Sequence, residues 1–302
     1  MSQLKTICGC AKDAVSLILK VLISAGVVMH KSVSFSFLIF VLALNFAKPA
    51  FAEDCVVLLH GLARVSNSMG ELETKLIRAG FSVANINFQS RKHQIDFLSY
   101  DAVSRGINAC FENNPVKVHF ITHSLGGILV RHFFKEHSLV NLGRVVMLGP
   151  PNQGSELVDR LKSFPGFSLL GPAGKALGTD VESIPRKFGP IPFELGVIAG
   201  TRNITPLGFF WLDRPNDSVV TVESTKVEGM SEHISLPVTH TLMMRNNNVI
   251  DHSINFLRSG LPTTPVEPVI NIFLYFILIV SNNQKDTDTK FSKTYNYIFF
   301  KK

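Results

Sequence analysis

The sequence is poor in cysteine, with 4 among its 302 residues, and no Cys and His pairs recur at the spacing of a zinc site. A zinc centre is therefore excluded as an interpretation of its motifs. No segment of the chain requires a cofactor, and we predict none. A calcium site built from backbone and carboxylate oxygens leaves no such pattern and stays open.

The central part of the chain has little excess charge of either sign. The formal net charge is +7, but residues 53–260 hold twenty Lys and Arg against nineteen Asp and Glu. Residues 1–52 carry +4 and residues 261–302 carry +2. A nearly neutral body offers no basic surface for phosphate backbones, so we exclude nucleic acid as a partner.

Long hydrophobic runs are also missing, although the mean hydropathy of +0.23 is high for a soluble protein. The apolar run at residues 33–47 is shorter than the ~18 residues that favour a membrane-spanning helix. It follows a short basic start at 29–31 (MHK) and precedes 50–52 (AFA), a small-x-small pattern. These three features together are typical of a secretory signal peptide.

The two ends of the chain are therefore interpreted separately from the body. In residues 1–52 we expect translation to start at Met29 and cleavage to follow Ala52, which predicts a periplasmic or secreted protein; an uncleaved anchor that keeps it at the membrane is the alternative. The tail, residues 261–302, contains twelve apolar residues at 269–280. They are too few to span a bilayer but could lie on its surface or in a core, and we assign the tail no role.

Two cysteines remain in the predicted mature chain, Cys55 and Cys110, because Cys8 and Cys10 fall in the signal region. Cys55 begins a strand-like segment, and Cys110 ends a helix-like segment that precedes another strand, so both are expected near one edge of a sheet. Because thiols of exported proteins often pair, a Cys55–Cys110 disulfide is a hypothesis, with two free thiols as its alternative.

From residue 55 onward, strand-like and helix-like segments alternate. Strand patterns cover residues 55–59, 81–87, 116–122, 145–148 and 195–199. Helix patterns cover residues 68–79, 96–111, 126–137 and 249–257. Such alternation builds right-handed βαβ units, so residues 53–260 are predicted to form an α/β domain with a mostly parallel central sheet flanked by helices.

One long segment, about residues 151–192, interrupts the alternation. Seven prolines lie between Pro150 and Pro192, together with apolar clusters such as FPGFSLL at 164–170. Loop-rich insertions of this length are usually functional, and we predict a lid over the site. An irregular cap with no gating role is the alternative.

The most informative segment is VHFITHSLGGILV at residues 118–130. An apolar strand runs into Ser124, small residues permit a tight reversal, and a helix follows, which is the layout of a nucleophile elbow. The helix amino terminus then directs free N–H groups at an oxyanion beside the serine. Thr122 stands where the usual G-x-S-x-G pattern has its first glycine. His123 is expected to pack in the turn rather than to react.

A second element, His60-Gly61-Leu62, follows the strand at 55–59 and matches the loop that donates the other oxyanion N–H group. We predict that the backbone amides of Leu62 and Leu125 form the oxyanion hole. The side chain of His60 is expected to hydrogen-bond its own loop.

A serine nucleophile needs a later acid and a later histidine in this arrangement. The preferred acid is Asp217, in a polar turn after the last predicted strand, with Asp213 as its competitor. The preferred histidine is His240, on a loop before the last predicted helix; His233 and His252 compete with it. His252 is expected inside that helix, in a surface role.

With these motifs the chain resembles the lipase and esterase branch of the α/β-hydrolase superfamily. The resemblance covers about residues 55–260 through VVLLHGL, THSLGG, the Asp217 turn and His240, and residues 149–156 resemble relatives of the GPI inositol-deacylase domain. It implies the α/β-hydrolase fold, with a sheet of the eight-stranded type, a cap and a carboxylic-ester substrate. Thr122 and Ser218 depart from the pattern, because many relatives carry glycine there.

The sequence thus predicts an exported serine hydrolase of carboxylic esters, with an ester or lipid as substrate and contact with a membrane surface as a further possibility. His240 would act as general base for Ser124, and Asp217 would orient His240. An acyltransferase with the same triad is the first alternative. A non-catalytic envelope binding protein of the same fold is the second.

Overall fold

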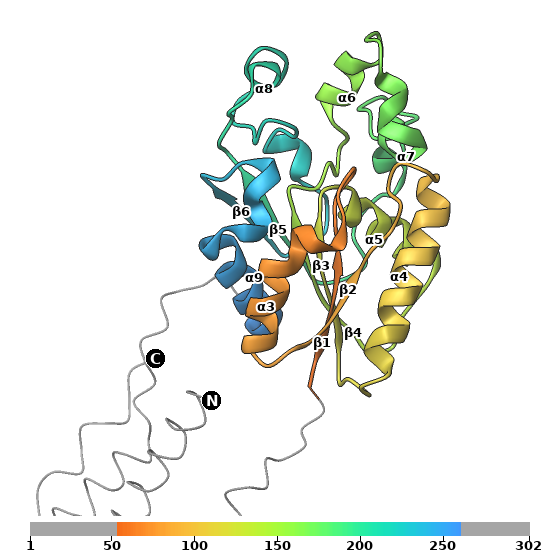
Figure 1. Cartoon of the computed structure of the whole chain (residues 1–302), viewed down its shortest axis with the longest axis vertical. Helices are drawn as coiled ribbons and strands as arrows, with labels where there is room; N and C mark the ends of the chain where they lie inside the picture. Colours follow the sequence, from red (N-terminus) through yellow and green to blue (C-terminus); the bar gives the residue numbers. More distant parts are fainter. Residues whose placement is uncertain (1–52, 261–302) are drawn as a thin grey trace, which may run out of the picture. The chain divides into compact units, whose positions relative to one another are not determined.

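Six parallel strands form the centre of the computed structural model, which describes residues 53–260 (Figure 1). In spatial order they are β2 (Ser82–Ile86), β1 (Cys55–Leu59), β3 (Val118–His123), β4 (Leu142–Leu148), β5 (Leu195–Gly200) and β6 (Glu232–Leu236). The first five overlap the predicted strands. The predicted signal region 1–52 and tail 261–302 lie outside the described residues.

The position of β1 decides where a site can form. The chain passes from β1 to β2 on one side and then crosses to β3 on the other, so that Leu59 pairs with both Ile86 and Thr122. In open parallel sheets, ligands bind beyond the carboxyl ends of the strands at such a switch point. The loops after β1 and β3 are the two in which the sequence predicts catalytic groups.

Helices cover both faces of the sheet (Figure 1). Alternate side chains of β1 enter two cores: Val57 and Leu59 pack in one, and Val56 and Leu58 in the other. The first core is covered by α4 (Ile95–Phe111) and α5 (Leu125–Glu136), and the second by α3 (Gly70–Arg78) and α9 (Asn247–Ser259). A 3₁₀ turn, η1 (Ser66–Met69), precedes α3. The four predicted helices are therefore confirmed, within about two residues at most ends.

The hypothetical disulfide is present. Cys55 at the start of β1 and Cys110 near the end of α4 are bonded, with their Cα atoms 5.7 Å apart. Both side chains are buried. The bond ties the first strand of the described body to the helix that covers it.

The insertion at 151–192 contains only short elements. These are α6 (Glu156–Leu161), η2 (Phe167–Leu170), α7 (Gly171–Lys175) and η3 (Ile184–Lys187). Beyond the insertion lie α8 (Pro206–Trp211), η4 (Glu223–Thr225) and η5 (His240–Arg245). In Figure 1, α6, α7 and α8 all lie beyond the carboxyl ends of the strands.

Two expectations about the sheet need correction. The resemblance implies a sheet of the eight-stranded type, whereas the described residues contain six strands. In addition, β6 was not predicted, because its sequence EHISL is short and half polar, as suits a partly buried strand at the sheet edge. Across residues 53–260, no helix is long and apolar enough to cross a bilayer.

Candidate active site

Ser124 lies in the sharp turn between β3 and α5. Its φ of 52° and ψ of −117° place a non-glycine residue in a sparsely populated region of backbone space, which is the strain expected of a nucleophile elbow. Its amide donates to the carbonyl of Leu148, at the end of β4 (2.9 Å). The turn therefore fixes the serine above the carboxyl end of the sheet.

The turn also requires the glycine that follows it. A Cβ on Gly126 would stand 2.5 Å from the carbonyl oxygen of Leu59, since α5 begins in close contact with β1. The hydroxyl of Ser124 makes no hydrogen bond within residues 53–260, and the side chain is only slightly exposed.

Two backbone amides near Ser124 have no acceptor in the described body. Leu125 is the first residue of α5, and an amide in that position has no partner within its helix. The amide of Leu62 likewise donates to nothing within residues 53–260. Gly61, which precedes Leu62, is close to Ser124, because a Cβ on Gly61 would lie 3.2 Å from Cβ of Ser124.

His60 has the structural role expected of it. Its Nδ1 donates to the carbonyl of Gly61 (2.9 Å), and its Nε2 accepts from the amide of Phe88 (3.2 Å). The ring also stacks on that of Phe88, with centroids 3.9 Å apart. Burial lowers the pKa of His60, so the ring is neutral and fixes the loop that carries Leu62.

Asp217 and His240 meet beyond the carboxyl end of β5. The carboxylate of Asp217 is fully buried, and its Oδ1 accepts from the amides of Val219 (3.0 Å) and Val220 (2.8 Å). Its Oδ2 accepts from Nδ1 of His240 at 2.7 Å. The amide of His240 donates in turn to the carbonyl of Asp217 (3.0 Å). This double contact fixes both the ring and the main chain of the histidine.

The competing residues lie elsewhere. Asp213 is exposed. His233 lies in β6, where its Nε2 is 2.9 Å from the hydroxyl of Thr225. His252 is inside α9, as expected. Of the candidates from the sequence, the structure therefore brings together Asp217 and His240.

The end of β4 links this pair to the serine. Gly149 follows Leu148, the acceptor for the Ser124 amide, and a Cβ on Gly149 would lie 3.1 Å from both Oδ2 of Asp217 and Nδ1 of His240. No hydrogen bond joins Ser124 to His240 within the described residues. Such bonds are often long in free enzymes and tighten when substrate binds.

Comparison with known proteins rests on structure. No family model matches the sequence, and no curated protein matches it. The mature lipase BlEst2 of Bacillus licheniformis superposes with a TM-score of 0.60 at 19% identity, over 70% of this chain and 94% of that one. Its propeptide form gives 0.60 at 18%, over 73% and 54%. Lipase B of Aspergillus fumigatus gives 0.51 at 16%, over 73% and 56%. The chain has the α/β-hydrolase fold.

Within this α/β-hydrolase fold, both departures from the usual glycine pattern are accommodated. Thr122 is a buried residue of β3, paired with Leu59 and Met147 on the neighbouring strands. Ser218 has a φ of 90°, and its hydroxyl donates to Oδ1 of Asn203 and accepts from the amide of Ile204, each at 2.9 Å. These hydrogen bonds compensate for the strained backbone next to Asp217.

His123 makes one contact that the sequence predicts and one that it does not. The side chain is buried and packs in the turn, as expected. It also contacts His240, since the ring centroids are 4.7 Å apart. The contact joins residues 117 positions apart, and no pattern in the sequence indicates it.

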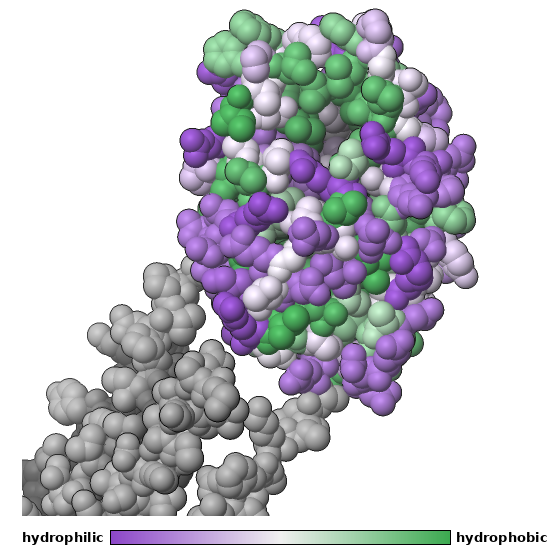
Figure 2. All heavy atoms as spheres, viewed as in Figure 1, coloured by the Kyte–Doolittle hydropathy of each residue, from purple (hydrophilic) through white to green (hydrophobic). Residues whose placement is uncertain are grey.

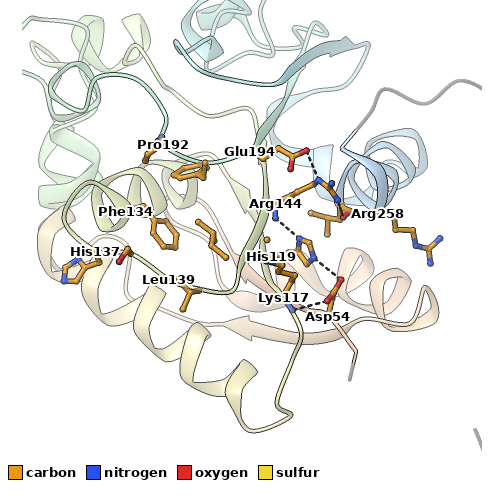
Figure 3. Close-up of a pocket in the computed structure, with 15 residues that line it drawn as sticks. Asp54, Lys117, His119, Phe134, His137, Leu139, Arg144, Pro192, Glu194 and Arg258 are labelled. Carbon is orange, nitrogen blue, oxygen red and sulfur yellow. Dashed lines mark hydrogen bonds and ion pairs between the residues drawn. The ribbon is translucent and has the colours of Figure 1, made fainter. Parts of the chain in front are cut away.

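A separate cavity of about 700 Å³ lies at the opposite edge of the sheet, at the amino ends of β3, β4 and β5 (Figure 3). Its polar groups are joined to one another. His119 donates to Asp54 (3.3 Å) and accepts from the amide of Arg144 (2.8 Å), whose guanidinium pairs with Glu194 (2.8 Å). This cavity is not the site of Ser124. In the described body, no cluster of His, Cys, Asp and Glu could hold a metal ion.

Proposed function

We propose that the protein is an exported serine hydrolase of carboxylic esters that acts through an acyl-enzyme on Ser124. The observation that carries this proposal is the bond of 2.7 Å between Asp217 and Nδ1 of His240, beside a serine held in a strained elbow. Because Nδ1 carries the proton in that bond, Nε2 of His240 has a lone pair and can act as general base.

The first half of the proposed reaction forms the acyl-enzyme. As Oγ of Ser124 attacks the ester carbonyl carbon, its proton passes to Nε2 of His240, and the carbonyl electron pair moves to oxygen. The free amides of Leu62 and Leu125 would stabilise this oxyanion. The intermediate collapses when the C–O bond to the alcohol breaks, and His240 returns the proton to the departing alkoxide.

The second half releases the acid. Water attacks the acyl carbon while His240 accepts its proton, and the same two amides hold the second oxyanion. Breaking the bond to Oγ then regenerates Ser124 with a proton from His240. Asp217 keeps the imidazole in one tautomer and stabilises the imidazolium in both halves.

Apolar side chains beyond the carboxyl edge support a lipid or other long-chain ester as substrate. Phe209 and Phe210 of α8 are 55% and 77% exposed, and Leu169 of the insertion is 70% exposed. The insertion and α8 touch through Phe164 and Trp211, whose ring centroids are 5.3 Å apart. Figure 2 shows hydrophobic residues around a hollow at this end of the body. We propose that these exposed apolar side chains, here called the apolar rim, also contact the membrane or lipid surface.

Helix α8 also contacts the turn that carries Asp217. A Cβ on Gly208 would lie 2.8 Å from Cα of Ser218, the neighbour of Asp217. Substrate held against the aromatic residues of α8 would therefore lie close to the catalytic residues. The insertion contacts the loop after β1 in a similar way, because a Cβ on Gly174 would lie 2.7 Å from the side chain of Leu62.

Export is supported by the Cys55–Cys110 disulfide, since such bonds persist in oxidising compartments. We propose cleavage after Ala52, two residues before the first strand begins at Cys55. Mass spectrometry of the intact protein from the culture medium or periplasm should give a mature chain that starts at Glu53. A chain that retains residues 29–52 in the membrane fraction would contradict this proposal and favour the anchor.

The decisive experiment for activity is hydrolysis of p-nitrophenyl esters of increasing chain length by the purified protein. Wild type should turn over these esters and react with a fluorophosphonate probe, and Ser124→Ala should lose both while keeping its fold. Ser138→Ala, at an exposed serine on the opposite edge of the sheet, is the matched control. Product analysis with added alcohol distinguishes hydrolysis from acyl transfer. If wild type neither hydrolyses any ester nor reacts with the probe, the enzymatic proposal fails.

A further inference from the structure

We infer that His123 is a positioning residue that holds the main chain of the general base, His240. The inference rests on the proposed function, because it assigns to a residue outside the triad the task of aiming the histidine of that triad. It begins with the bond of 2.9 Å between Nε2 of His123 and the backbone carbonyl of His240.

The direction of this bond follows from its partner. A carbonyl oxygen can only accept, so Nε2 of His123 must carry a proton. The ring is 2% exposed, and burial together with the neighbouring His240 lowers the pKa of His123 well below its ordinary value. His123 is therefore neutral, with the proton on Nε2 and a lone pair on Nδ1.

The other side of the His123 ring faces the loop after β1, which carries Gly61 and Leu62. A Cβ on Gly61 would stand 2.6 Å from Nδ1 of His123, so the glycine leaves the space that the imidazole fills. That Nδ1 is buried and has no hydrogen-bond partner within residues 53–260. The ring thus lies between the loop that carries Leu62 and the loop that carries His240.

With this bond, His240 is held at three points. Its amide and its Nδ1 both bind Asp217, and its carbonyl binds His123. Within residues 53–260, the polar atom of His240 left without a partner is Nε2, the atom that must face Ser124. Since His123 directly precedes Ser124 in the chain, the residue that fixes the base moves together with the nucleophile. An error of about 1 Å in such an arrangement can cost roughly 100-fold in rate.

Two substitutions separate the hydrogen bond from the packing. His123→Leu keeps a buried side chain of similar bulk but cannot donate, whereas His123→Gln keeps an N–H group near the place of Nε2. We expect His123→Leu to lower kcat on a soluble ester about 10- to 100-fold with KM changed by less than about twofold. His123→Gln should recover most of the lost kcat. Both variants should unfold at similar temperatures.

Equal loss of kcat in the two variants, or a wild-type kcat in His123→Leu, would overturn the inference. Should His123→Leu not fold, His123→Met gives the same comparison. The tautomer provides a test without turnover: ¹⁵N NMR of the histidine-labelled Ser124→Ala protein should show a protonated Nε2 and a bare Nδ1 at His123. The reverse tautomer overturns the role of His123, while the proposed function is tested separately by fluorophosphonate labelling of wild type.

Discussion

Gly126 lies so close to β1 that a Cβ would stand 2.5 Å from the carbonyl oxygen of Leu59. This approach sets the start of α5, and with it the direction of the Leu125 amide. Backbone atoms cannot move aside as a flexible side chain can, so the space for a methyl group must come from a shift of the whole elbow.

Gly126→Ala is therefore expected to lower the free energy of unfolding by about 1–3 kcal/mol and to reduce kcat strongly. Urea unfolding and ester turnover measure the two effects. Gly70→Ala is the matched control, because the nearest atom to a Cβ on Gly70 is 3.6 Å away. It should leave activity unchanged; a similar loss of stability in both variants would contradict the steric argument.

Asp217→Asn tests the acid. The amide can occupy the same space, but it can offer Nδ1 of His240 a donor instead of an acceptor, which favours the wrong tautomer. We expect kcat to fall about 10⁴-fold with little change in stability. Asp213→Asn, at the exposed competitor four residues away, should keep wild-type kcat. If Asp213→Asn were the damaging change, the assignment of the acid would be wrong.

The sequence signals for the candidate residues are local. A strand, a serine followed closely by Gly126 and Gly127 and a helix define the elbow within thirteen residues, Asp217 lies in a polar turn, and His240 lies on a loop before a helix-like segment. The sequence offered the disulfide as a hypothesis, with two free thiols as its alternative, and the structure contains the bond.

What the sequence did not indicate depends on packing between distant segments. The bond of His123 to His240 joins the end of β3 to a loop 117 residues later, and α8 lies against Ser218 through Gly208. Strand β6 was missed because its half-polar residues become a strand by pairing with β5. Each of these three features depends on tertiary packing, which periodicity along the chain does not indicate.

Reduction of the Cys55–Cys110 bond should destabilise the protein without removing the catalytic groups. The bond closes a loop of 55 residues, which restricts the unfolded chain, and such bonds typically contribute about 2–4 kcal/mol. Unfolding of the double variant Cys55→Ser/Cys110→Ser should show this loss and should be insensitive to dithiothreitol. Once reduced, wild type should have the same free energy of unfolding as the double variant. Equal free energies of unfolding for oxidised and reduced wild type would contradict the prediction.

Stability should also fall as the pH is lowered from about 7 to 5. Burial lowers the pKa of His60, His119 and His123 from the ordinary value of 6.5, so the folded protein takes up these protons at lower pH than the unfolded chain. The stability that they contribute is present above pH 6.5 and is lost below it, by up to about 1.4 kcal/mol per pH unit for each ring.

His119 offers the simplest test because it lies far from the serine, at the amino edge of the sheet. His119→Asn should flatten the slope of unfolding free energy against pH by up to one proton, as measured by urea titrations between pH 5 and 7. His119→Gln, which also removes the titrating ring, should flatten the slope to the same extent. An unchanged slope in His119→Asn would mean that the ring binds its proton equally well in the folded and the unfolded protein, which would contradict the prediction.

Phe210 tests whether the apolar rim serves lipid substrates. Its ring is 77% exposed on α8. A charge placed there should oppose insertion into an acyl-chain surface, while a small dissolved ester would still reach Ser124. Phe210→Asp is therefore expected to reduce turnover of emulsified long-chain esters about tenfold or more while its turnover of a short soluble ester stays near that of wild type. Val140→Asp makes the same change at a fully exposed valine between α5 and β4, away from the rim. Equal effects of the two variants, or equal loss on both esters in Phe210→Asp, would show that α8 does not serve the lipid surface.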